Sequence, residues 1–319
     1  MKRNPSLLAT GLMIIMAMAS CVSTPTNDST QTDTTAGLPS QASEPAPLAE
    51  ALPASEAPAV AGKPVPVLKE RTEEYQVPVV LKETKAFADG VVDQIMENTW
   101  SQDYSRIISS LIRKPSIPEP AGKTSYEYKN GILAIRVNYG PDGAVQNRLA
   151  FDYDAKGQLV RETMADGKGV VQSVSEWSWE DGRKAEWKVL DPKGLVLART
   201  LYRYQDVQLA ELLMSDGAGN NTGRAGYRYN DDGVLVGIQY FSAAGTPQDR
   251  IEYVIEAGLP VQEKSFRTDG RLERSRLYDY GSEGQILKMT LTDASGRPRE
   301  STSYEYAFRT ETRTVSYYE

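Results

Sequence analysis

The sequence predicts a mainly β protein, an antiparallel β-meander repeat array that forms a twisted or rolled sheet, with a short N-terminal helical segment. Two observations predict the sheet. Pairs of aromatic residues separated by one residue, such as Tyr202/Tyr204, recur every 25 or 26 positions, and a fixed period of this length indicates repeated supersecondary units. Between the pairs lie tight turns with Asp or Ser before Gly, such as Asp166 to Gly169. Asp accepts backbone hydrogen bonds there, and Gly takes the positive φ that closes a hairpin.

Residues 1–20 have the organisation of a signal peptide, in which two basic residues precede an apolar run too short to span a bilayer. Met18 to Cys21 resembles the bacterial lipobox. This resemblance implies that Cys21, the only cysteine, is acylated and anchors the protein to a membrane. Val22 occupies the position where Asp retains enterobacterial lipoproteins at the inner membrane, so the outer membrane, on its periplasmic or surface face, is favoured. An ordinary signal peptide with an unrelated cysteine is the alternative.

Residues 21–64 are rich in Pro, Ala, Ser and Thr and contain few large apolar residues. Such a segment cannot bury enough surface to offset the entropy lost on ordering. We therefore expect a disordered tether that holds the following domain away from the membrane.

Residues 65–121 are predicted to form an extended segment and then an amphipathic helix. Val-Pro-Val runs at 65–67 and 77–79 favour extended chain, since proline lacks the donor that a central strand needs. From Thr84 onward, apolar residues fall at three- and four-residue spacings, which predicts helix over 84–114. We expect this helix to cap the first repeat, as repeat arrays require. The alternative is that it binds a partner protein.

Residues 122–319 are predicted to contain about eight repeat units, each reading as strand, turn, strand, turn. Because side chains alternate along a strand, both members of an aromatic pair face the same side. Repeats in register would align the rings in a ribbon across the sheet, either as packed core or as a platform for sugar rings or a peptide strand. The candidate ligand surface consists of Tyr126, Tyr128, Tyr153, Trp177, Trp179, Tyr202, Tyr204, Tyr227, Tyr229, Tyr278 and Tyr280.

The repeats resemble a known family. Phe151 to Val160 and Tyr227 to Val236 look like the YD repeat of bacterial Rhs and wall-associated proteins, with partial similarity to its MORN-like variants. The resemblance covers about residues 122–308. It implies a β-strand array, curled into a shell in some members, used for surface display, for carbohydrate or protein contact, or for enclosing a toxin. Because this chain has neither a long array nor an extra C-terminal domain, a toxin-carrying role is not expected.

Composition excludes several classes of function. The chain has no histidine and one cysteine, which leaves no Cys/His nucleophile and no Cys/His zinc site. Its net charge of −7 disfavours nucleic-acid binding, which needs a basic face. Turn aspartates are interpreted as turn formers, because no loop concentrates carboxylates as calcium sites do. No catalytic residue, metal or cofactor is predicted.

A membrane-spanning barrel is disfavoured as well, because the strand from Arg271 to Tyr280 carries charged residues on both of its sides. The function expected from the sequence is therefore that of a lipid-anchored envelope protein, acting as a non-catalytic binding or scaffold module for a protein or glycan. Two alternatives remain open. One is an enzyme acting on cell-wall glycan, and the other is a structural subunit of an envelope complex.

Overall fold

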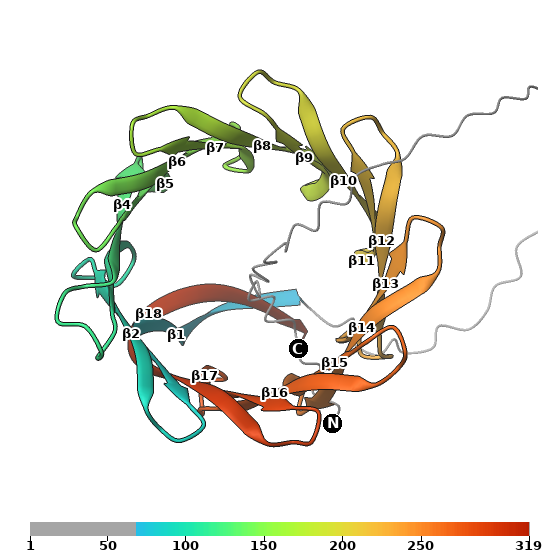
Figure 1. Cartoon of the computed structure of the whole chain (residues 1–319). Helices are drawn as coiled ribbons and strands as arrows, with labels where there is room; N and C mark the ends of the chain where they lie inside the picture. The colour runs from blue at the N-terminus through green and yellow to red at the C-terminus, as the bar shows by residue number, and fades with distance from the viewer. Residues whose placement is uncertain (1–67, 319) are drawn as a thin grey trace, which may run out of the picture. The chain divides into compact units, whose positions relative to one another are not determined.

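The computed structural model describes residues 68–318, which form a closed antiparallel barrel of 18 strands (Figure 1). Each strand is hydrogen-bonded to the strands before and after it in the chain, and β1 pairs with both β2 and β18. The pairing of β1 with β18 closes the wall. The signal peptide predicted at 1–20, the lipidated Cys21 and the tether predicted at 21–64 lie outside the described residues.

The strands are joined by short turns over most of the barrel, and their bounds are as follows. They are β1 Leu68–Phe87, β2 Val92–Trp100, β3 Ile107–Arg113, β4 Gly122–Lys129, β5 Ile132–Tyr139, β6 Val145–Tyr153, β7 Leu159–Asp166, β8 Val171–Glu180, β9 Arg183–Leu190, β10 Val196–Gln205, β11 Gln208–Asp216, β12 Asn221–Tyr229, β13 Leu235–Ser242, β14 Pro247–Glu256, β15 Leu259–Phe266, β16 Leu272–Tyr280, β17 Ile286–Asp293 and β18 Pro298–Tyr318.

The predicted fold class is wrong in two respects. The array is not a twisted or rolled meander sheet but a closed barrel, because its first strand pairs with its last. The helix predicted over 84–114 is also absent, and residues 68–318 contain no helix at all. Strands β2 and β3 occupy that segment, and β2 supplies the edge to which β1 pairs. The segment is rich in β-branched residues, and two bulges in its pairing disturb the period of two by which strands are recognised.

The turns follow the chemistry expected from the sequence. In the β7–β8 turn, the Asp166 carboxylate accepts hydrogen bonds from the backbone N–H groups of Lys168 and Val170, both at 2.9 Å. Gly169 closes the turn with a φ of 83°, a conformation that favours glycine. The Asp-to-Gly spacing therefore marks each turn of this type in the sequence.

Burial distinguishes the two faces of the wall. On β6, Asn147, Leu149 and the pair Phe151/Tyr153 are buried or half-buried, whereas the alternating residues from Gln146 to Asp152 are exposed. A curved sheet crowds side chains on its concave face and separates them on its convex face, so the more buried set faces the interior. Register pairs such as Leu149↔Met164 and Tyr202↔Leu212 extend this assignment from strand to strand. The aromatic pairs therefore point into the barrel.

The interior is not filled as a globular core would be. Seven hydrophobic residues are buried among the described ones, and the aromatic side chains of the interior are only half-buried. Barrels of about this strand number have a lumen wider than their side chains can fill. The buried residues are Val79, Val137, Leu149, Val174, Leu212, Ala225 and Ile238.

The paired strands β1 and β18 are much longer than the rest and continue past the wall. β1 pairs with β2 only over 82–86, and β18 pairs with β17 only over 298–303. Beyond the register shift after Val80, residues 68–80 pair with 306–318 and with no other strand. This two-stranded ribbon leaves the wall beside β2 (Figure 1), and both of its outer edges are unpaired among the described strands.

Candidate ligand-binding interior

The two members of each aromatic pair have different surroundings. In five pairs the ring donor of the second member is bonded to a backbone carbonyl of the preceding strand, and Trp100, which follows Asn98 instead of an aromatic residue, forms the same kind of bond. These bonds are Trp100 Nε1 to Val80 O at 2.9 Å, Tyr128 Oη to Ile107 O at 3.0 Å, Trp179 Nε1 to Leu159 O at 2.8 Å, Tyr229 Oη to Leu209 O at 2.9 Å, Tyr280 Oη to Pro260 O at 2.8 Å and Tyr306 Oη to Ile286 O at 2.5 Å.

These second-position residues stabilise the joint between neighbouring strands. Of the predicted surface, Tyr128, Trp179, Tyr229 and Tyr280 are engaged in this way. The sequence carries a signal for this role. In the repeats the second position is always Tyr or Trp, both of which carry a donor, except for Ile255. The first position, by contrast, includes Phe151, which has none.

The first-position residues lie nearer the middle of each strand and present their rings to the interior. The hydroxyls of Tyr202, Tyr227 and Tyr253 form no hydrogen bond with any described residue. Burial raises the pKa of Tyr227 to about 12, so its hydroxyl stays protonated and can donate. Tyr278 differs, because its hydroxyl lies 3.4 Å from the Glu263 carboxylate, which also pairs with Arg276.

The densest interior cluster lies on strands β10 to β14. Leu212, Ala225 and Ile238 are buried there in cross-strand contact. Tyrosines surround them on four different strands, with aliphatic side chains between. These are Tyr202, Tyr227, Tyr240 and Tyr253. The interior wall on this side is thus apolar with hydroxyl groups at intervals.

The opposite side of the interior, on β4 to β9, carries more polar groups. Arg136 lies opposite Tyr126 and Leu149 across the neighbouring strands. Its Nε atom and the Nε1 atom of Trp187 are buried without a hydrogen-bond partner among residues 68–318. Burial raises the pKa of Glu162, an effect that the charge of Arg136 opposes. Two donors therefore stand unsatisfied beside the aromatic rings, where a ligand oxygen or a water molecule would satisfy them.

The structure places every residue of the predicted surface on the interior face, but spread around the whole ring rather than at one site. Within residues 68–318, no three side chains of the His, Cys, Asp and Glu types gather where they could hold a metal ion. The same residues include no helix that could cross a membrane.

Comparison with known proteins gives little similarity. No protein-family model and no curated protein matches the chain. Among solved structures, a porin-like protein from Bacteroides uniformis is 11% identical with a TM-score of 0.41, covering 72% of this chain and 96% of its own. A porin-like protein from Bacteroides vulgatus is 10% identical with a TM-score of 0.30, covering 72% and 98%.

A third solved structure, TcdB2-TccC3 without its hypervariable C-terminal region, is 12% identical with a TM-score of 0.24. The alignment covers 72% of this chain and only 17% of that much longer one. All of these similarities are too low to define a common fold or family. The resemblance to YD repeats therefore stays a prediction from the sequence motifs.

Proposed function

We propose that this protein is a non-catalytic envelope lipoprotein whose barrel encloses an extended glycan. Acylated Cys21 would attach it to the membrane, and residues 21–64 would tether the barrel. The observation that carries the proposal is the set of half-buried first-position aromatics on the interior face, whose hydroxyls are in part unbonded. Aromatic faces stack on the apolar faces of sugar rings, and unsatisfied donors suit sugar hydroxyls.

The outer face of the wall supports a location in water beside the membrane. Its ion pairs include Arg224–Glu211 at 2.8 Å and Arg161–Glu176 at 3.2 Å. A lipid-facing wall needs a continuous apolar band, and charged side chains there destabilise the barrel. The membrane attachment we propose is therefore the N-terminal anchor alone.

Binding of chito-oligosaccharides of increasing length to the full-length protein in an uncharged detergent tests this function. Tryptophan fluorescence serves as the readout, since Trp177 and Trp187 face the interior. We expect affinity to rise with oligosaccharide length, because a longer chain contacts more rings. Tyr227→Ala should weaken binding about two- to tenfold, the size of one aromatic contact.

Leu197→Ala is the matched control, since Leu197 is an exposed side chain of the outer face, and it should bind as the parent protein does. Absence of binding at every length, or equal loss in both variants, would refute an interior glycan site.

A second candidate function, a structural subunit of an envelope complex, is favoured by one observation. The β1–β18 ribbon carries two strand edges that no described strand covers. Such edges accept an added strand from a partner protein.

A further inference from the structure

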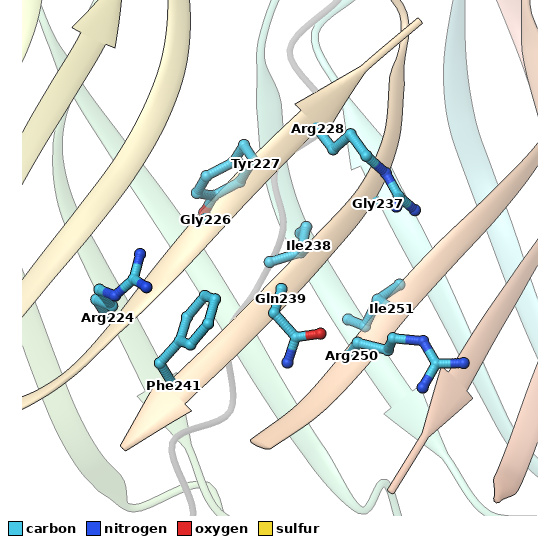
Figure 2. Close-up of a pocket in the computed structure, with 10 residues that line it drawn as sticks. All are labelled: Arg224, Gly226, Tyr227, Arg228, Gly237, Ile238, Gln239, Phe241, Arg250 and Ile251. Carbon is cyan, nitrogen blue, oxygen red and sulfur yellow. The ribbon is translucent and has the colours of Figure 1, made fainter. Parts of the chain in front are cut away.

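An outward-facing depression of about 230 Å³ lies on the wall over β12, β13 and β14 (Figure 2). Arg224 and Arg228 occupy positions of β12 that alternate with the buried Ala225, so the depression opens on the outer face. The inward-facing residues Tyr227, Ile238 and Ile251 also border it. Arg224 and Phe241 lie on one side in Figure 2, and Arg228 and Arg250 on the other. The depression is separate from the proposed interior glycan site, and the inference drawn from it does not depend on that site.

Two glycines make this depression. Neither Gly226 nor Gly237 has a backbone conformation that requires glycine, because neither has a φ in the left-handed region. Glycine inside a strand weakens it, and often marks a place where another group approaches the backbone. A Cβ added at Gly237 would lie 2.9 Å from the Arg228 guanidinium. A Cβ added at Gly226 would meet nothing closer than the Phe241 ring at 3.7 Å, so space stays open above its backbone.

The two flanking arginines are held in place. The Arg224 guanidinium stacks on Phe241 with its carbon 3.6 Å from the ring centroid, and it donates to Glu211 at 2.8 Å. Arg250 stacks on the Phe266 ring at 4.0 Å and donates to Glu252 at 2.8 Å. Each pairs with one carboxylate and keeps further N–H groups available, since a guanidinium has five.

Arg228 has neither a stacked aromatic ring nor a paired carboxylate among the described residues. It forms no ion pair or hydrogen bond with any described residue, and it lies over Gly237 in the cleared space (Figure 2). Three guanidinium groups thus surround a small depression on a chain whose net charge is −7, and one of them is uncompensated. A planar guanidinium matches carboxylate and phosphate oxygens in a two-bond geometry.

We propose that this depression binds an oxyanion, a carboxylate or phosphate carried by a molecule about the size of one sugar or one lipid headgroup. Arg228 pairs with the oxyanion, Arg224 and Arg250 flank it, and the bare backbone at Gly226 gives the rest of the ligand room. In an envelope, such a group belongs either to a free or glycan-borne acid or to an anionic lipid.

Isothermal titration of the full-length protein in an uncharged detergent tests the proposal, with inorganic phosphate, glucuronate, and mixed micelles containing phosphatidylglycerol as three separate probes. We expect saturable binding of at least one probe. Arg228→Gln should weaken it about tenfold or more, as expected for loss of a charged hydrogen-bonded pair. Arg148→Gln is the matched control, since Arg148 is an exposed arginine of β6 on the outer face, and it should bind unchanged.

Gly226→Val fills the depression while leaving all three arginines, and should also weaken binding about tenfold. If Gly226→Val loses its thermal transition, the proposal is decided by the binding affinities of Arg228→Gln and Arg148→Gln alone. Binding of phosphate or glucuronate identifies a soluble or glycan acid, and binding of the lipid micelles alone identifies a headgroup. The proposal is overturned if no probe binds in the millimolar range, or if Arg228→Gln and Arg148→Gln bind equally well.

Discussion

At the scale of single residues, the two positions of each aromatic pair do different work. The second position fastens its strand end to the preceding strand through a side-chain donor, as Tyr229 does to the Leu209 carbonyl at 2.9 Å. The first position offers an interior ring, and the Tyr227 hydroxyl has no bond to any described residue. Removing the hydroxyl at each position should therefore have different consequences for stability.

Tyr229→Phe is expected to lower the free energy of unfolding by about 1 kcal/mol, because it leaves a half-buried carbonyl without its donor. Tyr227→Phe removes an unbonded hydroxyl two residues away and should leave stability almost unchanged. Urea denaturation followed by circular dichroism measures both. Equal losses in the two variants would mean that the bond to Leu209 does not stabilise the barrel.

At the scale of the element, β1 and β18 pair in two parts with different roles. Residues 82–87 and 300–305 close the wall, whereas residues 68–80 and 306–318 form the ribbon. Wall closure depends on pairs such as Thr84↔Ser303 and Lys85↔Thr302. The ribbon tip is held by its own contacts, among them Tyr75 Oη to Glu311 at 2.7 Å and Arg313 to Glu73 at 3.1 Å. Those contacts join the two ribbon strands to each other and not to the neighbouring wall strands, so they add little to the wall.

Truncation after Thr310 should therefore leave the cooperative thermal transition of the barrel nearly unchanged, since every wall-closing pair is kept. Truncation after Arg297 removes β18 entirely and should abolish the transition, because β1 and β17 lose their shared neighbour. Thermal melts by far-ultraviolet circular dichroism compare the two. A truncation at Thr310 that unfolds the protein would show that the ribbon is part of the barrel's stability.

At the scale of the whole molecule, the charged outer face and the proposed acyl anchor together predict that the protein is attached to the membrane through its N-terminus. Cys21→Ser should move the protein from the membrane fraction into the aqueous wash, because the acyl chains are the only part that we propose to be embedded in lipid, and a single headgroup bound at the Arg228 depression would be lost on washing. Ser23→Ala, two residues away, should stay with the membranes. Immunoblots of washed envelope fractions measure the distribution. A Cys21→Ser protein that resists washing would point to lipid contact by the barrel itself.

The sequence and the structure agree most closely where interactions are local. Turns such as 166–169 depend on residues a few positions apart, and alternation places Tyr202 and Tyr204 on one face from sequence alone. Closure was not predictable in this way, since it depends on Phe87↔Glu300 and its neighbours, which are distant in sequence. The error over 84–114 has the same origin, because pairing with β1 and β4 overrides a local apolar spacing that favours helix.

The candidate sites also divide into features set by local sequence and features set by the pairing of strands. The donor at the second aromatic position is visible in the repeat itself. The depression beside Gly226 is not, because it needs the register that sets Gly226 against Gln239 and Gly237 against Arg228. A glycine in a strand suggests that a ligand or another part of the chain approaches its backbone closely, but only the strand pairing shows which side chains surround it.

The pairing of the first strand with the last also dictates when the protein can fold. β1 is synthesised first, yet its wall partner at 300–305 is made only after every other turn of the ring. Contacts between such distant segments form slowly, and incomplete rings expose hydrogen-bonding edges to neighbouring chains. Until its C-terminus is made, the nascent chain is an unfinished sheet with two unpaired strand edges, and both edges can pair with neighbouring chains.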